Sequence, residues 1–295
     1  RKWASTPKKF FRNERQCSLK MANHRIIPVI LLKNGRVVQS KSFNRHQVLG
    51  NPSSIVGRFS NWNADELIYL DISRDKNYDL KRDDLNFENR GSILEIIHDF
   101  SKRSFMPLTI GGGIKSIQDV EDRLRAGADK VTINTEAYNR PQLISDCAKI
   151  FGSQCIVISI DAKKVASDSW EVFVEFGKKA TGISPDTWAK KMEDMGAGEI
   201  LINSIDRDGK ANGYDLDLVN NVVKAVGLPV VAMGGAGAPE HFSEIIDYAS
   251  PSGVAASNIF QYTENAVFEI NTYLHESGYN VRSPKINSVT HLGDY

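Results

Sequence analysis

The second half of this 295-residue chain repeats the first half in the same order, and this repeat limits the possible folds more than any other feature. Four segments of the first half, each built around an apolar run, have counterparts in the second half. The pairs are 26–35 with 156–165, 65–75 with 198–209, 106–116 with 228–238, and 130–138 with 253–262. Chance explains one such pair easily, but four pairs in one order poorly. The repeat therefore predicts a fold built from two similar halves.

Short apolar, β-branched runs alternate with longer amphipathic segments along most of the chain. The predicted strands are 26–32, 66–71, 107–110, 130–134, 155–161, 199–204, 229–233 and 253–256. The clearest predicted helices are 116–126, 141–151 and 216–226. Eight strands separated by helices favour an α/β fold, a (β/α)8 TIM barrel built from two similar half-barrels, over an open doubly wound sheet. No GxGxxG motif opens the first unit, as a dinucleotide-binding sheet would require.

The composition is that of a globular chain and excludes several classes of protein. Hydrophobic residues make up 41% and charged residues 25%, which suffices for a sizeable core. The longest apolar run, 26–32, is too short to cross a bilayer. A net charge of +1 creates no global field that favours nucleic acid. We therefore expect a cytoplasmic protein that binds neither membrane nor nucleic acid.

Cysteine and histidine usage predicts neither a disulfide framework nor a metal site. The three cysteines form no CxxC pair, and the six histidines are scattered without an HxxxH motif. Nothing in the sequence indicates a nucleotide redox cofactor. We expect a chain that works without metal or cofactor.

The ends of the chain differ from its middle. Segment 1–22 is basic, with seven Lys/Arg and one acidic residue in its first twenty positions. It has no apolar core of the kind that a secretory signal needs. A transit-like segment or an expression remnant would also look like this, but we favour a disordered N-terminal arm. The barrel is then expected at 23–282, and a loosely held polar tail at 283–295.

Two glycine-rich turns at matching places in the repeat predict anion binding. The barrel's working face lies where its strands end. Glycine lets backbone N–H groups approach an anion, and the following helix N-terminus adds positive charge. The predicted phosphate-binding residues are Gly111, Gly112, Gly113, Asn134, Thr135, Asp208, Gly209, Gly234, Gly235, Gly237 and Ser257. The alternative is that the glycines only shape tight turns, but their symmetric placement beside small polar residues favours a ligand with two phosphates.

Acid–base chemistry needs a carboxylate between the two turns. Asp161 ends an otherwise apolar strand and is the preferred candidate, because apolar walls can tune the pKa of its carboxyl group. Asp71, Asp206 and Asp208 also follow strands, but Asp71 and Asp206 are as consistent with loop or helix caps. The position that matches Asp161 in the first half is Leu31, which cannot move a proton.

Several long stretches resemble one known family, from about residue 25 to residue 282. They include RIIPVILLKNGRVV, DELIYLDI, GADKVTINT, FGSQCIVISIDAKK, GAGEILINSIDRDG, GGAG and NVR. On these motifs the chain resembles the cyclase (synthase) subunit of imidazole glycerol phosphate synthase. The resemblance implies a half-barrel-duplicated (β/α)8 protein that docks a class I glutaminase at one face. Ammonia then passes through the barrel to a bis-phosphate substrate at the other face.

The resemblance also implies an ammonia gate at the bottom of the barrel. The family's ring of Arg, Glu, Lys and Glu is matched by Arg25, Glu66, Lys130 and Glu199. From the sequence alone, two ion pairs that simply plug the barrel would explain the same charges. Asp129 matches a residue that the family uses at the glutaminase interface.

The chain also departs from the family at functional positions. Leu31 stands where the family has the first of two catalytic aspartates, and Asp161 matches the second. Gln39 replaces a loop lysine, Asn203 a threonine and Met233 a serine. Loss of a general acid or base costs on the order of 10²–10⁴-fold in rate. Imidazole ring formation is therefore in question.

The sequence around Leu31 is similar to a divergent branch of the family that is linked to surface polysaccharide synthesis. Members of this branch work with a glutaminase and an N-acetyl sugar amidotransferase. We therefore expect a subunit that channels ammonia from a partner glutaminase to a phosphorylated substrate, for amidination of an N-acetyl sugar in surface polysaccharide (lipopolysaccharide) synthesis. The alternatives are the cyclase subunit of histidine biosynthesis, a barrel isomerase of the sister type, and a non-catalytic scaffold for the glutaminase.

Overall fold

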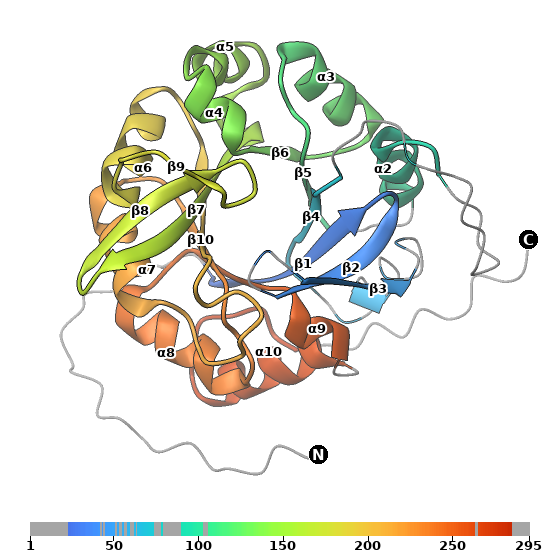
Figure 1. The fold of residues 1–295 in the computed structure, drawn as a ribbon. Helices are drawn as coiled ribbons and strands as arrows, with labels where there is room; N and C mark the ends of the chain where they lie inside the picture. Colours follow the sequence, from blue (N-terminus) through green and yellow to red (C-terminus); the bar gives the residue numbers. More distant parts are fainter. Residues whose placement is uncertain are drawn as a thin grey trace, which may run out of the picture.

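In this computed structural model, the parallel strands form a closed barrel surrounded by helices (Figure 1). The structure describes residues 23–41, 43, 45–50, 52, 55, 58–59, 62, 64–73, 78, 90–102, 106–262 and 265–284. The predicted basic arm at 1–22 and nearly all of the predicted tail at 283–295 lie outside the described residues.

Within this described part, the barrel has eight parallel strands, and the prediction of a (β/α)8 TIM barrel is confirmed. The strands are β1 (Arg25–Lys33), β4 (Leu67–Asp71), β5 (Leu108–Gly111), β6 (Lys130–Ile133), β7 (Ile156–Ala166), β10 (Glu199–Ser204), β11 (Val230–Met233) and β12 (Gly253–Ala256). Each pairs in parallel with its neighbours, and pairing of β1 with β12 and of β7 with β10 closes the ring. All eight predicted strands are found, with ends that differ by a few residues.

The middles of the strands are mostly apolar because both of their faces are buried. In β1, Ile26 and Ile30 point outward into the core shared with the helices. Ile27, Val29 and Leu31 point the other way and belong to a second cluster inside the barrel. The buried members of the inner cluster are Ile27, Val29, Leu31, Val38, Ile68, Val157, Leu201, Val231, Met233 and Ala255. The period-2 alternation of a strand thus supplies two apolar cores at once.

The helices form a layer outside the barrel, and side-chain caps fix where several of them begin. They are α2 (Ile93–Ser101), α3 (Ile117–Ala126), α4 (Thr135–Asn139), α5 (Gln142–Phe151), α6 (Pro185–Asp194), α7 (Leu216–Ala225), α8 (Pro239–Ala249), α9 (Asn258–Tyr262) and α10 (Ala266–Glu276). Ser116 caps α3 by accepting from the Asp119 amide at 3.1 Å, and Asp215 caps α7 in the same way. The three predicted helices match α3, α5 and α7 to within one residue at each end.

The sequence did not predict two antiparallel extensions, which occupy equivalent places in the two halves. The first strand of each half continues into a hairpin at the barrel mouth. The added strands are β2 (Arg36–Lys41) and β3 (Arg45–Gly50) after β1, and β8 (Ser169–Val174) and β9 (Lys179–Ala180) after β7. The duplication therefore extends to structure outside the eight βα units.

The two ends of the barrel domain meet beside the β1–β12 seam. The His24 amide donates to the Asn280 carbonyl at 2.8 Å, and His24 forms an isolated parallel bridge with Val281. The His24 Nδ1 atom also lies 2.7 Å from the Pro251 carbonyl oxygen. Among the described residues, no helix is long and apolar enough to cross a membrane.

Candidate functional site

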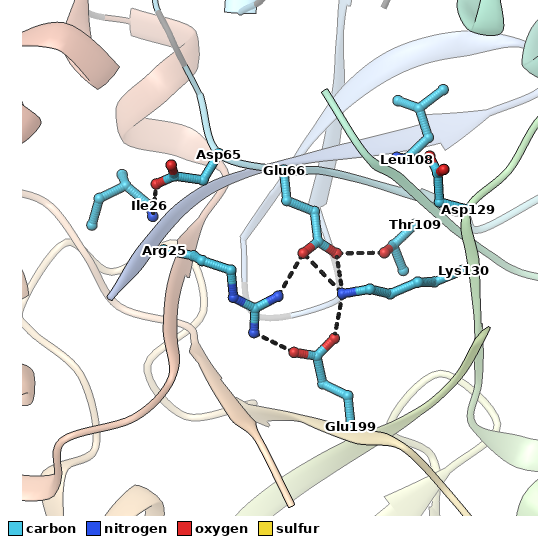
Figure 2. A network of polar contacts seen from close by, with 9 residues as sticks. All are labelled: Arg25, Ile26, Asp65, Glu66, Leu108, Thr109, Asp129, Lys130 and Glu199. Atoms are coloured by element: carbon cyan, nitrogen blue, oxygen red, sulfur yellow. Dashed lines mark hydrogen bonds and ion pairs between the residues drawn. The ribbon is translucent and has the colours of Figure 1, made fainter. Parts of the chain in front are cut away.

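Four charged side chains form one network at the end of the barrel where the strands begin (Figure 2). Arg25 donates to Glu66 Oε2 at 2.6 Å and also to Glu199. Lys130 Nζ lies 3.0 Å from Glu66 Oε2 and 2.8 Å from Glu199 Oε2. Each acid therefore bridges both bases, and the four charges alternate in sign around a ring. The four residues that the sequence predicted for a gate do come together, and their role as an ammonia entrance stays a prediction.

The acidic members of the ring are the most deeply buried. The side chains of Glu66 and Glu199 are 3% and 7% exposed, against 25% for Arg25. Thr109 adds a fifth contact by donating to Glu66 Oε1 at 2.5 Å. Burial lowers the pKa of Arg25, but attraction to Glu199 and Glu66 outweighs burial and raises the pKa above its usual value. Each side chain of the ring therefore depends on both of its neighbours for compensation of its charge.

Two aspartates beside the ring hold the starts of neighbouring strands (Figure 2). Asp65 accepts from the Ile26 amide at 2.8 Å, and Asp129 accepts from the Leu108 amide at 2.8 Å. Asp129 is exposed at this end of the barrel. The contact assigns it a structural role, and its predicted place in a glutaminase interface stays a prediction.

The interior between this ring and the barrel mouth is lined mainly by aliphatic side chains. Leu31 is 7% exposed there and belongs to the inner apolar cluster. Thr132 Oγ1 is buried without a hydrogen-bond partner among the described residues. A leucine at this point leaves the first half-barrel without an ionisable side chain where the second half has Asp161.

Asp161 lies at the mouth between two asparagines, Asn134 directly after β6 and Asn203 on β10. Asn134 Nδ2 donates to Asp161 Oδ2 at 2.8 Å, and Asn203 Nδ2 donates to Oδ1 at 3.1 Å. Burial raises the pKa of Asp161 to about 6, although both of these hydrogen bonds lower it, and the nearby charge of Asp208 adds to the rise. A carboxyl group with this pKa exchanges protons readily near neutral pH, as a general acid or base must.

This raised pKa predicts that Asp161 destabilises the folded state at neutral pH. Its pKa of about 6 in the folded chain lies above the usual value of 3.8 for an aspartate. The protonated carboxyl group is favoured in the folded state. Its contribution to stability is therefore fully present below about pH 4 and is lost as pH rises through about 6. Asp161→Asn is expected to raise the melting temperature at pH 7.5 by on the order of 5 °C and to have little effect at pH 4.

The new NH₂ group in this variant can still find an acceptor. The Oδ1 atom of Asn203 is buried without a partner, so a flip of the Asn203 amide can satisfy the new NH₂ group. Thermal melts across pH 4–8 test the prediction. A variant less stable than wild type at pH 7.5, or a difference that does not change with pH, would contradict it.

The first glycine turn follows β5 and requires glycine for steric reasons. Gly112 has φ +105°, and a Cβ atom there would clash with the Asp71 carbonyl oxygen. The Gly112 carbonyl accepts a 2.6 Å hydrogen bond from the NH2 atom of Arg123, which lies on α3. No hydrogen bond is made by the Gly113 amide to any described residue.

The second turn follows β11 and is built in a similar way. Gly235 has φ +108°, and a Cβ atom there would clash with the Gly213 carbonyl. The Gly213 amide donates to the Gly235 carbonyl at 2.9 Å. The Gly237 amide donates to His241 Nδ1 at 3.1 Å, so this N–H group is already used within the protein.

Several other predicted phosphate ligands contact the two hairpins instead of an open site. Thr135 Oγ1 accepts from the Glu175 amide at 3.1 Å. Asp208 Oδ2 lies 3.2 Å from the donor Ser40 Oγ, and Gly209 packs beside the carbonyl of the same serine. Ser257 Oγ is buried at the mouth without a partner among the described residues.

Asp71 and Asp206 hold loops, as the alternative interpretation of the sequence allowed. Asp71 accepts from the Ser73 amide at 2.9 Å and from the Tyr78 hydroxyl at 2.7 Å. Asp206 accepts from the Lys164 amide at 2.7 Å and so fixes the start of the β7–β8 hairpin.

Sequence reasoning missed Tyr78 and Arg123. Burial raises the pKa of Tyr78, and its bond to Asp71 adds to that rise, so its hydroxyl stays protonated as a donor. Arg123 is only 6% exposed. A signal for it existed, because it lies one helical turn after Val120 on the apolar face of α3.

The fold and the site together define a duplicated (β/α)8 barrel protein with a charged ring at one end and a carboxyl group of raised pKa at the other. A family model described as "Histidine biosynthesis protein" matches residues 25–266. The chain belongs to this family.

Relatives with known names cover the same region. The chain is 41% identical over 263 residues to the "Imidazole glycerol phosphate synthase subunit HisF" of Clostridium botulinum (strain Okra / Type B1), which spans 89% of this chain and 100% of the relative. It is 42% identical over 262 residues to the subunit of the same name from Natranaerobius thermophilus, with 89% and 100% coverage. The Bacillus cereus (strain Q1) subunit is 41% identical over 262 residues, with the same coverage.

These comparisons contradict the expected role in sugar amidination. The relatives are named for imidazole glycerol phosphate synthase, and the matching family model is described by histidine biosynthesis. The predicted N-acetyl sugar amidotransferase partner and the link to surface polysaccharide are therefore withdrawn. The error came from giving the single departure at Leu31 more weight than the agreement along the rest of the barrel.

Proposed function

We propose that this chain is the cyclase subunit of an imidazole glycerol phosphate synthase. It takes ammonia from a partner glutaminase and combines it with a bis-phosphate ribonucleotide precursor, giving imidazole glycerol phosphate and an aminoimidazole carboxamide ribonucleotide. The observation that carries this proposal is the placement of an ion-paired ring and an ionisable carboxyl group at opposite ends of one barrel interior. Identity of 41% over the full length of a subunit with this name supports it.

The ring suits the entry of a small neutral molecule. Arg25 and Lys130 are each partly exposed, at 25% and 21%, while their carboxylate partners are buried. The bases therefore face the outside of the barrel bottom, where a glutaminase would dock. Beyond the ring, ammonia would meet mostly aliphatic walls, which exclude bulk water and offer ammonia no hydrogen bonds.

The mouth suits a substrate with a phosphate at each end. The two glycine turns follow β5 and β11, which are not neighbours in the barrel. Asp161 lies on β7, between β6 and β10. A ligand that spans the turns would place its central bonds near this carboxyl group.

Asp161 is the proposed acid–base residue. With a pKa near 6 it is mostly ionised at neutral pH, so it accepts a proton from the ammonia adduct and returns it at a later step. Leu31 has no group that can share this task. Water or the substrate's own phosphate must therefore serve as the second acid or base, and we expect slower turnover than in a barrel with two aspartates.

Turnover of the precursor tests this proposal directly. The purified chain is mixed with its glutaminase, glutamine and the bis-phosphate precursor, and glutamate release and precursor absorbance are followed. Ammonium salts replace glutamine and glutaminase in a parallel reaction. We expect precursor loss in both reactions, because the chemistry belongs to this chain and the glutaminase only supplies ammonia.

Two results would overturn the proposal. Stimulated glutamate release without precursor loss would make the chain a scaffold for the glutaminase. Absence of precursor loss with ammonium salt, in a chain that melts cooperatively, would exclude cyclase chemistry altogether.

A further inference from the structure

Arg123 is a buried cation that the proposed chemistry leaves unexplained. It lies on α3 with 6% of its surface exposed. Its NH1 atom donates to the Asp119 carbonyl at 2.8 Å within the helix, and NH2 donates to the Gly112 carbonyl at 2.6 Å. Its Nε atom has no partner among the described residues. A buried guanidinium with an unused donor is costly for stability, which suggests a role other than packing.

The second half-barrel has no counterpart to this cation. Arg123 lies seven residues after Ser116, the N-cap of α3, and the same step from Ala238, the N-cap of α8, leads to Ile245. Ile245 is fully buried. The matching site therefore accepts an aliphatic side chain, and the fold does not need an arginine there.

The bond from Arg123 fixes one peptide plane of the glycine turn. In a trans peptide the carbonyl and the following N–H point in opposite directions. With the Gly112 carbonyl held toward Arg123, the Gly113 N–H points away from the helix. Glycines at both positions have positive φ, at +105° and +63°, so without this bond the plane could rotate at little steric cost.

Carboxylates near Arg123 offset part of the cost of its burial. Burial lowers the pKa of Arg123, while the charges of Asp119 and Asp71 counteract this effect. Asp71 ends β4, and its carbonyl lies against Gly112. The cation therefore belongs to a polar cluster directly behind the turn.

We propose that Arg123 is a positioning residue that holds the Gly111–Gly113 turn with its amide directed at one phosphate of a two-phosphate ligand. The two anion sites then differ in construction. The first is held by a buried side-chain cation, and the second by the backbone bond between Gly213 and Gly235. The identity of the ligand rests on the proposed function, but the positioning role does not.

The test uses Arg123→Leu, Arg123→Lys and the matched control Arg125→Leu. Arg125 lies two residues further along α3, is 77% exposed and pairs only with Glu121 among the described residues. The kinetic readouts are KM and kcat for the bis-phosphate with ammonium salt. Calorimetric titrations give the Kd of each of the two monophosphate products.

For Arg123→Leu we expect KM to rise about tenfold, the size of a lost charge-assisted hydrogen bond, with kcat within about twofold. Only one of the two products should lose affinity, because only one turn is changed. Lysine keeps a donor and a charge, so Arg123→Lys should stay within about threefold of wild type. Arg125→Leu should match wild type.

Equal loss of affinity for both products, or a fall in kcat with KM unchanged, would show a general structural role and overturn the proposal. If Arg123→Leu does not fold, Arg123→Met replaces it, and a wild-type KM in that variant would do the same. If the wild-type chain does not turn over the precursor, the proposed function fails, and titration with inorganic phosphate decides the positioning role. Wild type should then bind at two sites, with only one of them weakened in Arg123→Leu, and unchanged phosphate binding would overturn it.

Discussion

Asp161→Asn is expected to reduce precursor turnover by about 10²–10⁴-fold with either glutamine or ammonium salt as the nitrogen source. Asparagine keeps the shape of the side chain but cannot accept and return a proton. Asp161 lies at the mouth and the ring lies at the other end of the barrel, so glutaminase binding should be unchanged. Steady-state kinetics and a co-purification assay measure the two effects separately.

Asp206→Asn is the matched control for this variant. It removes a carboxylate from the same face of the barrel, where Asp206 holds the Lys164 amide. Its effect on turnover should be less than about tenfold, because the contact is structural. An Asp161→Asn chain that keeps more than a tenth of wild-type turnover would show that another group carries the proton transfer.

Removal of one ring member is expected to destabilise the chain by about 3–5 kcal/mol. Lys130→Met leaves Glu66 and Glu199 buried with only Arg25 between them. The two carboxylates then share one cation instead of two. Denaturant melts measure the loss. The exposed pair of Lys190 with Glu193 provides the control, since Lys190→Met removes a solvated ion pair and should leave the midpoint unchanged.

A fourfold variant separates the ring's two possible roles. Replacing Arg25, Glu66, Lys130 and Glu199 together with apolar residues removes every buried charge at once, so stability should return to near the wild-type value. If the ring is a gate, glutamine-dependent turnover should still be impaired relative to turnover with ammonium salt. Equal turnover from both nitrogen sources would make the ring a structural plug.

The strands and the repeat could be predicted because they depend on burial. A strand buried on both faces must be apolar along its length, and this pattern is visible without any partner. The β8 hairpin strand was missed although it carries a period-2 signal, with Trp170, Val172 and Val174 buried in alternation. The strand is short, and it is not one of the eight repeated units that the repeat in the sequence marks.

Side-chain partners outside the barrel were harder to predict than the barrel residues themselves. Asp208 follows a strand as a phosphate ligand would, but the β2 hairpin that reaches it lies far away in sequence. The place of Arg123 on the apolar face of α3 marked it as unusual, but its partner, the Gly112 backbone carbonyl, carries no sequence signal. The four residues that the family resemblance indicated do contact one another, and their role as a gate stays a prediction. The inference from Leu31 to a different substrate was wrong because one residue cannot outweigh a whole barrel.

Because His24 contacts Asn280 and Val281, the two ends of the domain are adjacent, and the closed sheet could be cut at another place without loss of strand pairing. Every barrel strand has two parallel neighbours, and the β1–β12 seam is paired like the others. Joining residues 24 and 281 through a short linker would turn the domain into a covalent circle, which can be reopened between any two βα units. Circular permutants opened between β6 and β7 would begin and end with an intact half-barrel, and would place the two half-barrels in reversed order on one chain.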